Sequence, residues 1–346
     1  MDHAILDTPE RRTFYDKIDA QNLTPLWTVM GALITPEPRS GCRPALWRFA
    51  EIRAAMIEAG GLITAKEAER RVLILENPGL RGQSRATTSL YAGVQMVLPG
   101  EVAPAHRHSQ SALRFVLEGG GAHTAVDGEK TAMEVGDFII TPSMTWHDHS
   151  NESAEPIFWL DGLDIPLVQF LDASFAEGLG ADEQPISKPV GDSAARYGRN
   201  LLPVDQKRRS ATSPLFNYPY SATREALDGV ARVDLDACHG VKMRYANPET
   251  GDYAMPTIGA FIQLLPKDFH TAAYRSTDAA VFSVVEGSGR SQIGDVTVEW
   301  GPKDTFIVPS WAPVRHEARE EAVLFSFSDR PVHEKLGVFR ESRGNA

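Results

Sequence analysis

Four of the ten histidines in this 346-residue chain fall in two short segments whose spacing suits metal binding. His106 and His108 are separated by one residue, so on a β-strand their imidazoles share one face. His147 and His149 repeat this spacing in a second segment. Because imidazole is the commonest side-chain ligand of metals in proteins, the pair and a third histidine predict a metal centre.

The elements that must position these histidines are short β-strands. From Arg71 to Asp161 the chain alternates short apolar runs, such as Val72–Leu75 and Phe138–Ile140, with turn residues such as Pro99-Gly100. Strands at this spacing predict a sandwich or barrel. We therefore assign residues 66–172 to a metal-binding β-domain.

The first 65 residues read as a helical arm. Thr8 followed by Pro9 is a good helix start, and a second helix is expected from about Pro44 to Gly60-Gly61. Residues 173–250 are rich in turn formers over much of their length and predict an inter-domain connection. Short strands resume in residues 251–346.

The later strands repeat the earlier ones. Glu118-Gly119 precedes the segment Asp137–Pro142, and Glu286-Gly287 precedes Asp304–Pro309 at a nearly constant offset. This predicts two copies of one β-domain. When Pro309 is aligned with Pro142, Val314 falls at the position of His147 and His316 at that of His149, so the second copy is expected to be degenerate and without its own metal.

The two histidine segments resemble the two cupin motifs. Gly100 followed by His106 and His108 matches the first motif, and Gly136, Pro142, His147 and Asn151 match the second. The resemblance implies a mainly β bicupin, built from two tandem double-stranded β-helix (jelly-roll) barrels, with His106, His108 and His147 as metal ligands. Ala112 and Leu113 stand where cupins usually carry a glutamate ligand, and Met144 replaces a usual glycine.

Three neutral imidazoles leave coordination positions of a divalent ion open, and they leave its charge uncancelled. A structural zinc site would instead be closed. An open site suits a chelating anion and one further small ligand, as in Fe(II) sites that activate O₂. Mn, Ni, Co and Cu are also compatible with three imidazoles.

Strand parity indicates which neighbours face the histidines. Counting by twos reaches Arg114, a candidate fork for a substrate carboxylate, and His149, a candidate acid, base or hydrogen-bonding group. On the following strand Trp159 shares a face with Asp161, which could orient His149 or accept a proton from a substrate hydroxyl. Tyr91, Gly93 and Gln95 would form a wall for a flat ring, and either Arg70 or Arg71 faces inward.

Over nearly its whole length the chain is similar to the gentisate 1,2-dioxygenase family. The resemblance rests on the three-histidine set without glutamate, on Arg114 and on the tetrapeptide Trp146-His147-Asp148-His149. It implies a homotetrameric Fe(II) enzyme that opens gentisate (2,5-dihydroxybenzoate) with O₂ between the carboxyl-bearing carbon and the adjacent hydroxylated carbon, giving maleylpyruvate. The same resemblance implies that Arg70 or Arg71, Gln95, Arg114 and His149 surround the ring.

Three alternatives stay open at this point. Salicylate and 1-hydroxy-2-naphthoate dioxygenases are similar to the same pattern, a zinc cupin isomerase would expect the missing glutamate, and a non-enzymatic cupin would bind a small molecule without turning it over. The formal net charge of −11 disfavours nucleic acid and anionic membranes as partners. With two cysteines, no apolar run of membrane-spanning length and no signal-like N-terminus, a cytoplasmic location is expected.

Overall fold

The computed structural model describes residues 8–207 and 210–344, which divide into two units at Arg39 and Ser40. The described part of the first unit carries helices α1 (Pro9–Asp19) and α2 (Leu26–Leu33). Thr8 caps α1 by accepting a hydrogen bond from the backbone N–H of Arg11 at 3.3 Å, and Pro9 takes the first helical position. The helix start expected at Thr8-Pro9 is confirmed.

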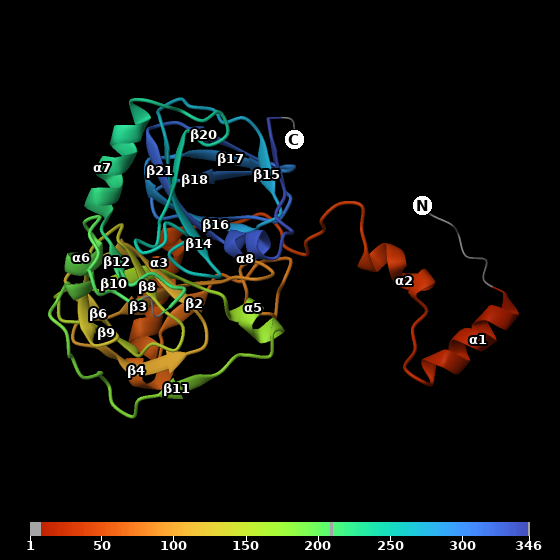
Figure 1. The fold of residues 1–346 in the computed structure, drawn as a ribbon, viewed down its shortest axis with the longest axis horizontal. Coiled ribbons are helices and arrows are strands. Elements are labelled where there is room, and N and C mark those ends of the chain that lie inside the picture. The colour runs from red at the N-terminus through yellow and green to blue at the C-terminus, as the bar shows by residue number, and fades with distance from the viewer. Residues whose placement is uncertain (1–7, 208–209, 345–346) are drawn as a thin grey trace. The chain divides into compact units, whose positions relative to one another are not determined.

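The second unit contains two β-domains, the first and second cupin, which lie one above the other in Figure 1. The first cupin consists of two facing antiparallel sheets, with strand orders β12-β8-β5-β10-β3-β2 and β11-β4-β9-β6-β7. Its strands are β2 (Val72–Ile74), β3 (Tyr91–Val97), β4 (Val102–His108), β5 (Ala112–Glu118), β6 (Ala122–Val126), β7 (Glu129–Met133), β8 (Phe138–Thr141), β9 (His147–Asn151), β10 (Ile157–Leu163), β11 (Ala176–Gly178) and β12 (Asn217–Tyr218).

The second cupin repeats this arrangement with the orders β1-β19-β16-β21-β14-β13 and β18-β17-β20-β15-β22. Its strands are β1 (Ala45–Trp47), β13 (Val241–Arg244), β14 (Gly259–Leu265), β15 (Tyr274–Ser276), β16 (Ala280–Glu286), β17 (Gly289–Ile293), β18 (Val296–Trp300), β19 (Thr305–Val308), β20 (Val314–Ala318), β21 (Ala322–Ser328) and β22 (Glu341–Arg343). The matching orders bear out the internal repeat and the bicupin architecture. Gly119 and Gly287, the glycines of the two Glu-Gly pairs, both have positive φ, at +89° and +75°.

Each cupin borrows an edge strand from outside its own repeat. β1 precedes the first cupin in the chain, yet it pairs with β19 of the second. β12 follows the first cupin and closes the matching edge of that domain beside β8. The second cupin also takes up β13, from the end of the stretch 173–250 assigned to the connection, because residues 241–244 pair in register with β14.

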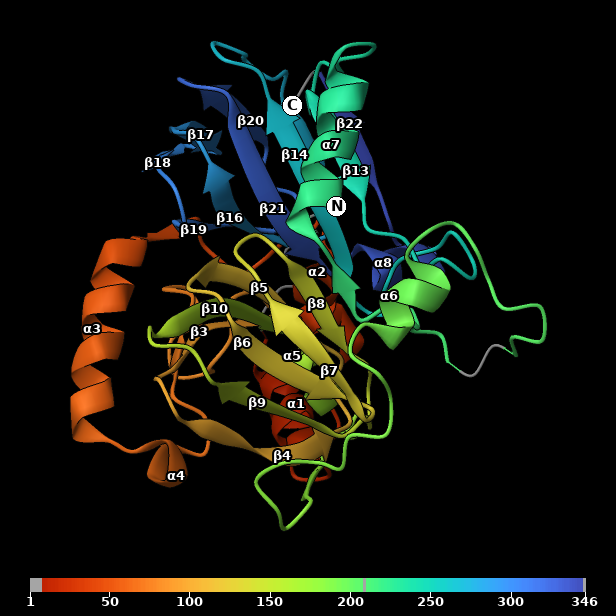
Figure 2. The same cartoon turned by 90° about the vertical axis from the view of Figure 1, so that its left-hand side faces the viewer.

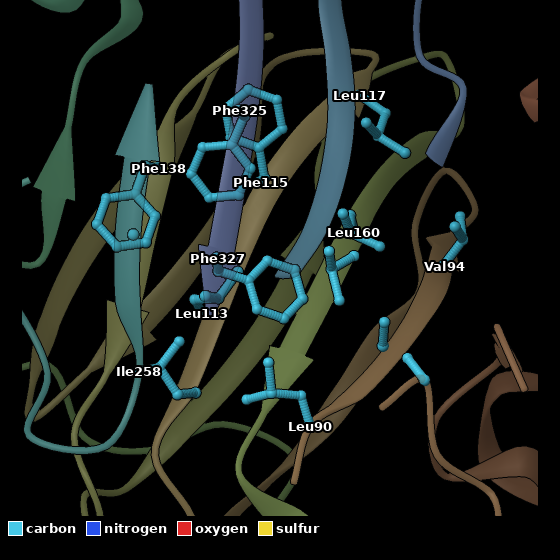
Figure 3. Close-up of a cluster of buried hydrophobic side chains, with 14 of the residues drawn as sticks. Leu90, Val94, Leu113, Phe115, Leu117, Phe138, Leu160, Ile258, Phe325 and Phe327 are labelled. Atoms are coloured by element: carbon cyan, nitrogen blue, oxygen red, sulfur yellow. The ribbon is translucent and has the colours of Figure 1, made fainter. Parts of the chain in front are cut away.

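The two cupins pack sheet against sheet through apolar side chains (Figure 3). Phe115 on β5 stacks on Phe325 of β21, with ring centroids 4.1 Å apart and planes at 7°. Gly162 on β10 makes room for Phe327, because a Cβ at this position would lie 2.7 Å from the ring. We call this layer, which the labelled side chains of Figure 3 outline, the seam between the cupins.

Helices cover the outer edges of the second unit (Figure 2). The expected helix from Pro44 begins later, as α3 (Phe49–Leu62), because Ala45–Trp47 are taken into β1. It continues through Gly60, whose missing side chain allows the helix to approach Met96. The remaining helices are α4 (Ala65–Ala68), α5 (Ile165–Phe170), α6 (Asp192–Tyr197), α7 (Tyr220–Ala231) and α8 (Arg330–Lys335).

Cys42 and Cys238 are both buried and unpaired as thiols. None of the helices in the described residues is long and apolar enough to span a membrane.

Candidate metal centre

Strands β4 and β9 bring three histidines together on the inner face of one sheet. Ring centroids lie 5.3 Å apart for His106 and His108, 4.2 Å for His106 and His147, and 4.8 Å for His108 and His147. One ring nitrogen from each lies within 4.8 Å of the others. β9 pairs with β4 so that His147 stands directly opposite His106. This group can hold a metal ion.

Backbone carbonyls orient the three rings. The Nδ1 atoms of His108 and His147 each lie 2.9 Å from a carbonyl oxygen, and Nδ1 of His106 lies 3.3 Å from another. The carbonyls belong to Gln110, Thr145 and Pro104, respectively. In His108 and His147, an Nδ1–H that donates to its carbonyl leaves Nε2 with its lone pair free for a metal. Nε2 of His147 is buried and has no hydrogen-bond partner among the described residues, as expected for a metal ligand.

Burial keeps these imidazoles neutral. It lowers the pKa of His106 to about 3, assisted by the Arg70 guanidinium, and the pKa of His108 to about 4. It also holds the pKa of His147 well below its ordinary value, with Arg114 adding to the effect. Metal binding requires the neutral ring, so the donor set is in the correct protonation state over the whole physiological range. Three neutral ligands leave the charge of a divalent ion for an anionic substrate to balance.

Arg114 enters the same interior from the opposite sheet. Its side chain is buried on β5, where it stands opposite Asp161 in the register with β10. One Nη donates to the hydroxyl of Thr141 at 2.6 Å, and Nε lies 3.8 Å from Asp161 Oδ1. Nε has no hydrogen-bond partner among the described residues. A buried guanidinium with unused donor capacity is suited to binding a carboxylate.

The two consecutive arginines point in different directions. Arg70 contacts the ring of His106 and donates to the carbonyl oxygen of Pro104 at 2.5 Å, so it lies beside the histidines. Arg71 instead forms a two-pronged ion pair with Glu101 at 2.7 and 2.8 Å. The sequence left open which of the two arginines faces inward; the Arg71 fork is occupied by Glu101, and Arg70 is the one beside the histidines. Burial, and after it the nearby Arg114, lower the pKa of Arg70 to about 10.

Asp161, Trp159 and His149 form a connected group behind the three histidines. Trp159 Nε1 donates to Asp161 Oδ1 at 2.9 Å, and the His149 ring lies 5.3 Å from the Trp159 ring. The sequence suggested that Asp161 could orient His149, but the described residues show no hydrogen bond between them; Asp161 Oδ1 instead accepts from Trp159 and lies near Arg114. Both ring nitrogens of His149 are buried without a partner in this part of the chain. Burial raises the pKa of Asp161 to about 6, although Arg114 opposes the shift.

Strand β3 supplies the remaining expected side chains. The first cupin interior contains Gln95, whose Nε2 is buried and without a partner among the described residues. A Cβ on Gly93 would lie 2.6 Å from Val72 and 2.8 Å from the Tyr91 hydroxyl, so these two side chains meet over the glycine. Val72 therefore packs beside Tyr91 over Gly93, in the wall expected from Tyr91, Gly93 and Gln95. Nothing in the sequence indicated that Val72 would lie there.

Thr141 is the other residue that the sequence reasoning missed. Its hydroxyl fixes the Arg114 guanidinium, and it is the last residue of β8, opposite Ala112. A hydroxyl directly before the motif proline, on a strand that is otherwise apolar, was the available signal.

The second cupin has different side chains at the ligand positions. Its strand register places Tyr274 at the position of His106, and by the same count Ser276 at that of His108. Val314 and His316 fall at the positions of His147 and His149, as the sequence alignment predicts.

Comparisons with known proteins agree with this geometry. A family model described as a cupin domain matches residues 93–163. The chain is 61% identical over 337 residues to gentisate 1,2-dioxygenase 1 from Aquipseudomonas alcaligenes, covering 97% of each chain. It is 39% identical to a gentisate 1,2-dioxygenase from Streptomyces sp, covering 95% of this chain and 94% of that one. A crystal structure of salicylate 1,2-dioxygenase from Pseudoaminobacter salicylatoxidans with gentisate adducts superposes with a TM-score of 0.94 at 33% identity, covering 99% of this chain and 96% of that one.

Proposed function

This chain belongs to the gentisate 1,2-dioxygenase family of ring-cleaving cupin dioxygenases, and on that premise we propose that it opens gentisate with O₂ to give maleylpyruvate. The observation that carries the proposal is a set of buried nitrogens without partners around the three histidines. Gln95 Nε2, Arg114 Nε and both ring nitrogens of His149 belong to it. An anionic ring that bears several oxygens would satisfy such a set.

We propose Fe(II) as the metal that His106, His108 and His147 hold. The buried, unpartnered Nε2 of His147 and the neutral state of all three rings fit this ion. When bound, Fe(II) supplies Lewis acidity toward substrate oxygens and the redox chemistry that activates O₂.

The two buried arginines bind and orient the substrate carboxylate in this proposal. Thr141 fixes one Nη of Arg114, and Nε, 3.8 Å from Asp161, has no hydrogen-bond partner among the described residues. After burial, the charge of Arg114 is the next cause that lowers the pKa of Arg70, so the two guanidinium groups lie close together. Together they create a local positive field inside a protein that is acidic overall. Such a field attracts a carboxylate and fixes which edge of the ring faces the histidines.

His149 and Gln95 serve the ring hydroxyls. A neutral imidazole has one donor and one acceptor nitrogen, so His149 can take a proton from a hydroxyl and return it. Gln95 donates through Nε2 to an oxygen on the ring. Tyr91 and Val72 meet over Gly93 and form a flat wall beside the ring, which excludes water from the site.

We also propose a cytoplasmic location, because two buried free thiols fit a reducing compartment. The homotetramer stays a prediction from the family resemblance.

Oxygen uptake by protein loaded anaerobically with Fe(II) tests the proposal. Gentisate, salicylate and 1-hydroxy-2-naphthoate are compared side by side, with protein loaded with Zn(II) as the control. The proposal expects uptake with gentisate together with the formation of maleylpyruvate. Uptake with only one of the monohydroxylated acids would retain the mechanism and change the substrate. No uptake at full iron occupancy would favour a binding protein instead of an enzyme.

A further inference from the structure

The interior of the second cupin is not filled, although the ligand histidines are replaced there. A cavity remains at the position that corresponds to the metal centre of the first cupin. Its lining includes Tyr274, Ser276 and Val314, the residues that replace the three ligand histidines. The centre of a water-sized sphere can move through about 40 Å³ of it. Because an enclosed single water needs almost no freedom for its centre, the cavity has room for more than one water-sized group.

A lysine ammonium faces this cavity. Lys242 on β13 pairs with Gln263 of β14, just as Val72 on β2 pairs with Gln95 of β3. Lys242 therefore occupies the place of the valine that lines the first cupin site. Its Nζ lies 5.1 Å from the Phe261 ring and 5.6 Å from the Phe282 ring. Among the described residues it has neither a hydrogen bond nor an ion pair.

Two further charged residues border the cavity, and each has one buried atom without a hydrogen-bond partner in the described chain. Arg275 lies over the Trp311 ring at 4.5 Å, and its buried Nε has no hydrogen-bond partner in the described chain. Asp278 also lines the cavity, with a buried Oδ1 that is unpartnered within the same residues. Arg330 is different, because it is already paired with Glu334 at 2.8 Å. On β15, Arg275 stands between Tyr274 and Ser276, whose side chains line the cavity, so its own side chain leaves the strand on the other face. Lys242 is therefore the cation on which an anion in the cavity would rest.

Aromatic faces compensate this charge only in part. A cation–π contact contributes about 0.5–2 kcal/mol, whereas an ammonium taken out of water without an anionic partner costs several kcal/mol. Burial accordingly lowers the pKa of Lys242 to about 8, although Asp278 opposes the shift. The ammonium is still protonated at neutral pH and available to an anion.

We propose that the second cupin binds a small monocarboxylate in this cavity, with its carboxylate on Lys242. A fixed ammonium thus supplies the positive charge that a metal ion would supply in the first cupin. The proposal does not depend on the proposed function of the first cupin, since it concerns other residues and no oxygen chemistry.

Line broadening of fluoroacetate in ¹⁹F NMR tests the proposal on the intact, iron-loaded protein. Fluoroacetamide, which is neutral and of nearly the same shape, is the ligand control. The variant Lys242→Met removes the charge, Lys242→Arg retains it, and Lys267→Met changes an exposed lysine elsewhere. All these proteins retain the three-histidine site. Any line broadening from binding there is therefore the same in each, and the difference between variants reports on the second cupin.

We expect Lys242→Met to weaken fluoroacetate binding about tenfold or more, the usual effect of a lost charge-assisted hydrogen bond. Lys242→Arg and Lys267→Met should retain binding, and fluoroacetamide should bind more weakly than fluoroacetate to the wild type. Equal broadening of the wild type and Lys242→Met, or of the acid and the amide, would overturn the proposal. If Lys242→Met does not fold, Val314→Phe fills the cavity without removing a charge, and unchanged binding in that variant would be equally decisive against it.

Discussion

Asp164 and Asp329 occupy the same position in the two cupins, and each accepts a hydrogen bond from the other cupin. Asp164 binds the backbone N–H of Ser111 at 2.9 Å and the Thr257 hydroxyl at 2.5 Å, and Thr257 directly precedes the second cupin sheet. Asp329 binds the backbone N–H of Ala279 at 3.0 Å and the hydroxyl of Ser89 at 2.5 Å. The two carboxylates therefore join the cupins reciprocally.

The Asp164 connection predicts a pH-dependent stability. Burial raises the pKa of Asp164 to about 6, from about 4 in an unfolded chain. The folded state therefore holds a proton between these values, and its stability falls as the pH rises from about 4 to about 6. Relative to Asp164→Asn, which cannot ionise, the wild type should lose about 2–3 kcal/mol of unfolding free energy across this window, measured by urea titration.

Thr257→Val provides the matched control. It removes a hydrogen bond that lowers the pKa of Asp164, so the window should move to higher pH. If wild type and Asp164→Asn show the same pH dependence, the carboxyl titrates as it does in the unfolded chain and this account of the connection is wrong.

Replacing each ligand histidine should abolish stoichiometric iron. We expect His106→Ala, His108→Ala and His147→Ala to bind Fe(II) far more weakly, because each removes one of only three protein donors. His149→Ala is the control, since its ring is oriented toward Trp159 and it should retain iron while kcat/KM falls by about 10²–10⁴-fold. The measurement is the number of iron ions per chain, determined by mass spectrometry for each variant. Full occupancy in any ligand variant would remove that histidine from the ligand set.

Arg114→Lys should lower kcat/KM for gentisate by about 10–100-fold. A lysine retains the charge but loses the planar fork that Thr141 and Asp161 hold in place. Arg71→Lys is the matched substitution at an arginine whose fork binds Glu101. It should reduce stability and leave kcat/KM nearly unchanged. The reverse pattern in steady-state oxygen uptake would restore Arg71 to the site.

Gly162→Ala should destabilise the seam by about 1–3 kcal/mol. The added Cβ would lie 2.7 Å from the Phe327 ring and 2.9 Å from Leu113, both closer than real contacts. Combining it with Phe327→Leu should recover part of the loss. Gly61→Ala in α3 has open space around its Cβ and should stabilise the helix by about 0.5–1 kcal/mol. Unfolding free energies of the four proteins measure both effects, and a neutral Gly162→Ala would contradict the close packing.

The sequence predicted the cupin repeat and the clustering of His106, His108 and His147, because strand periodicity is a local property that spacing records. Arg114 was assigned inward by counting through the turn that separates β4 from β5. A turn does not preserve that count. The orientation instead follows from the pairing of Arg114 with Asp161 on β10, which lies far along the chain.

Other features depend on contacts that no local pattern contains. The directions of Arg70 and Arg71 could not be predicted, because they depend on the ion pair that Glu101 forms with Arg71. Glu101 lies 30 positions further along the chain than Arg71, outside any local pattern. The helix start at Pro44 was wrong because β1 completes a sheet whose other strands begin nearly two hundred residues later. Lys242 lay in a predicted connection, where a lysine is ordinarily solvated, and only the register with β14 places it inside a sheet.

The residues that we propose to face the substrate share their strands with the seam. Arg114 lies between Leu113 and Phe115, and Asp161 lies beside Gly162, so the polar side chains face the histidines while their neighbours pack on the second cupin. The seam residues Leu113 and Phe115 are thus each one backbone position away from Arg114. We therefore expect variants selected for a new aromatic acid to include changes in the second cupin that do not contact the ligand. The packing of the second cupin would then influence the substrate specificity of the first.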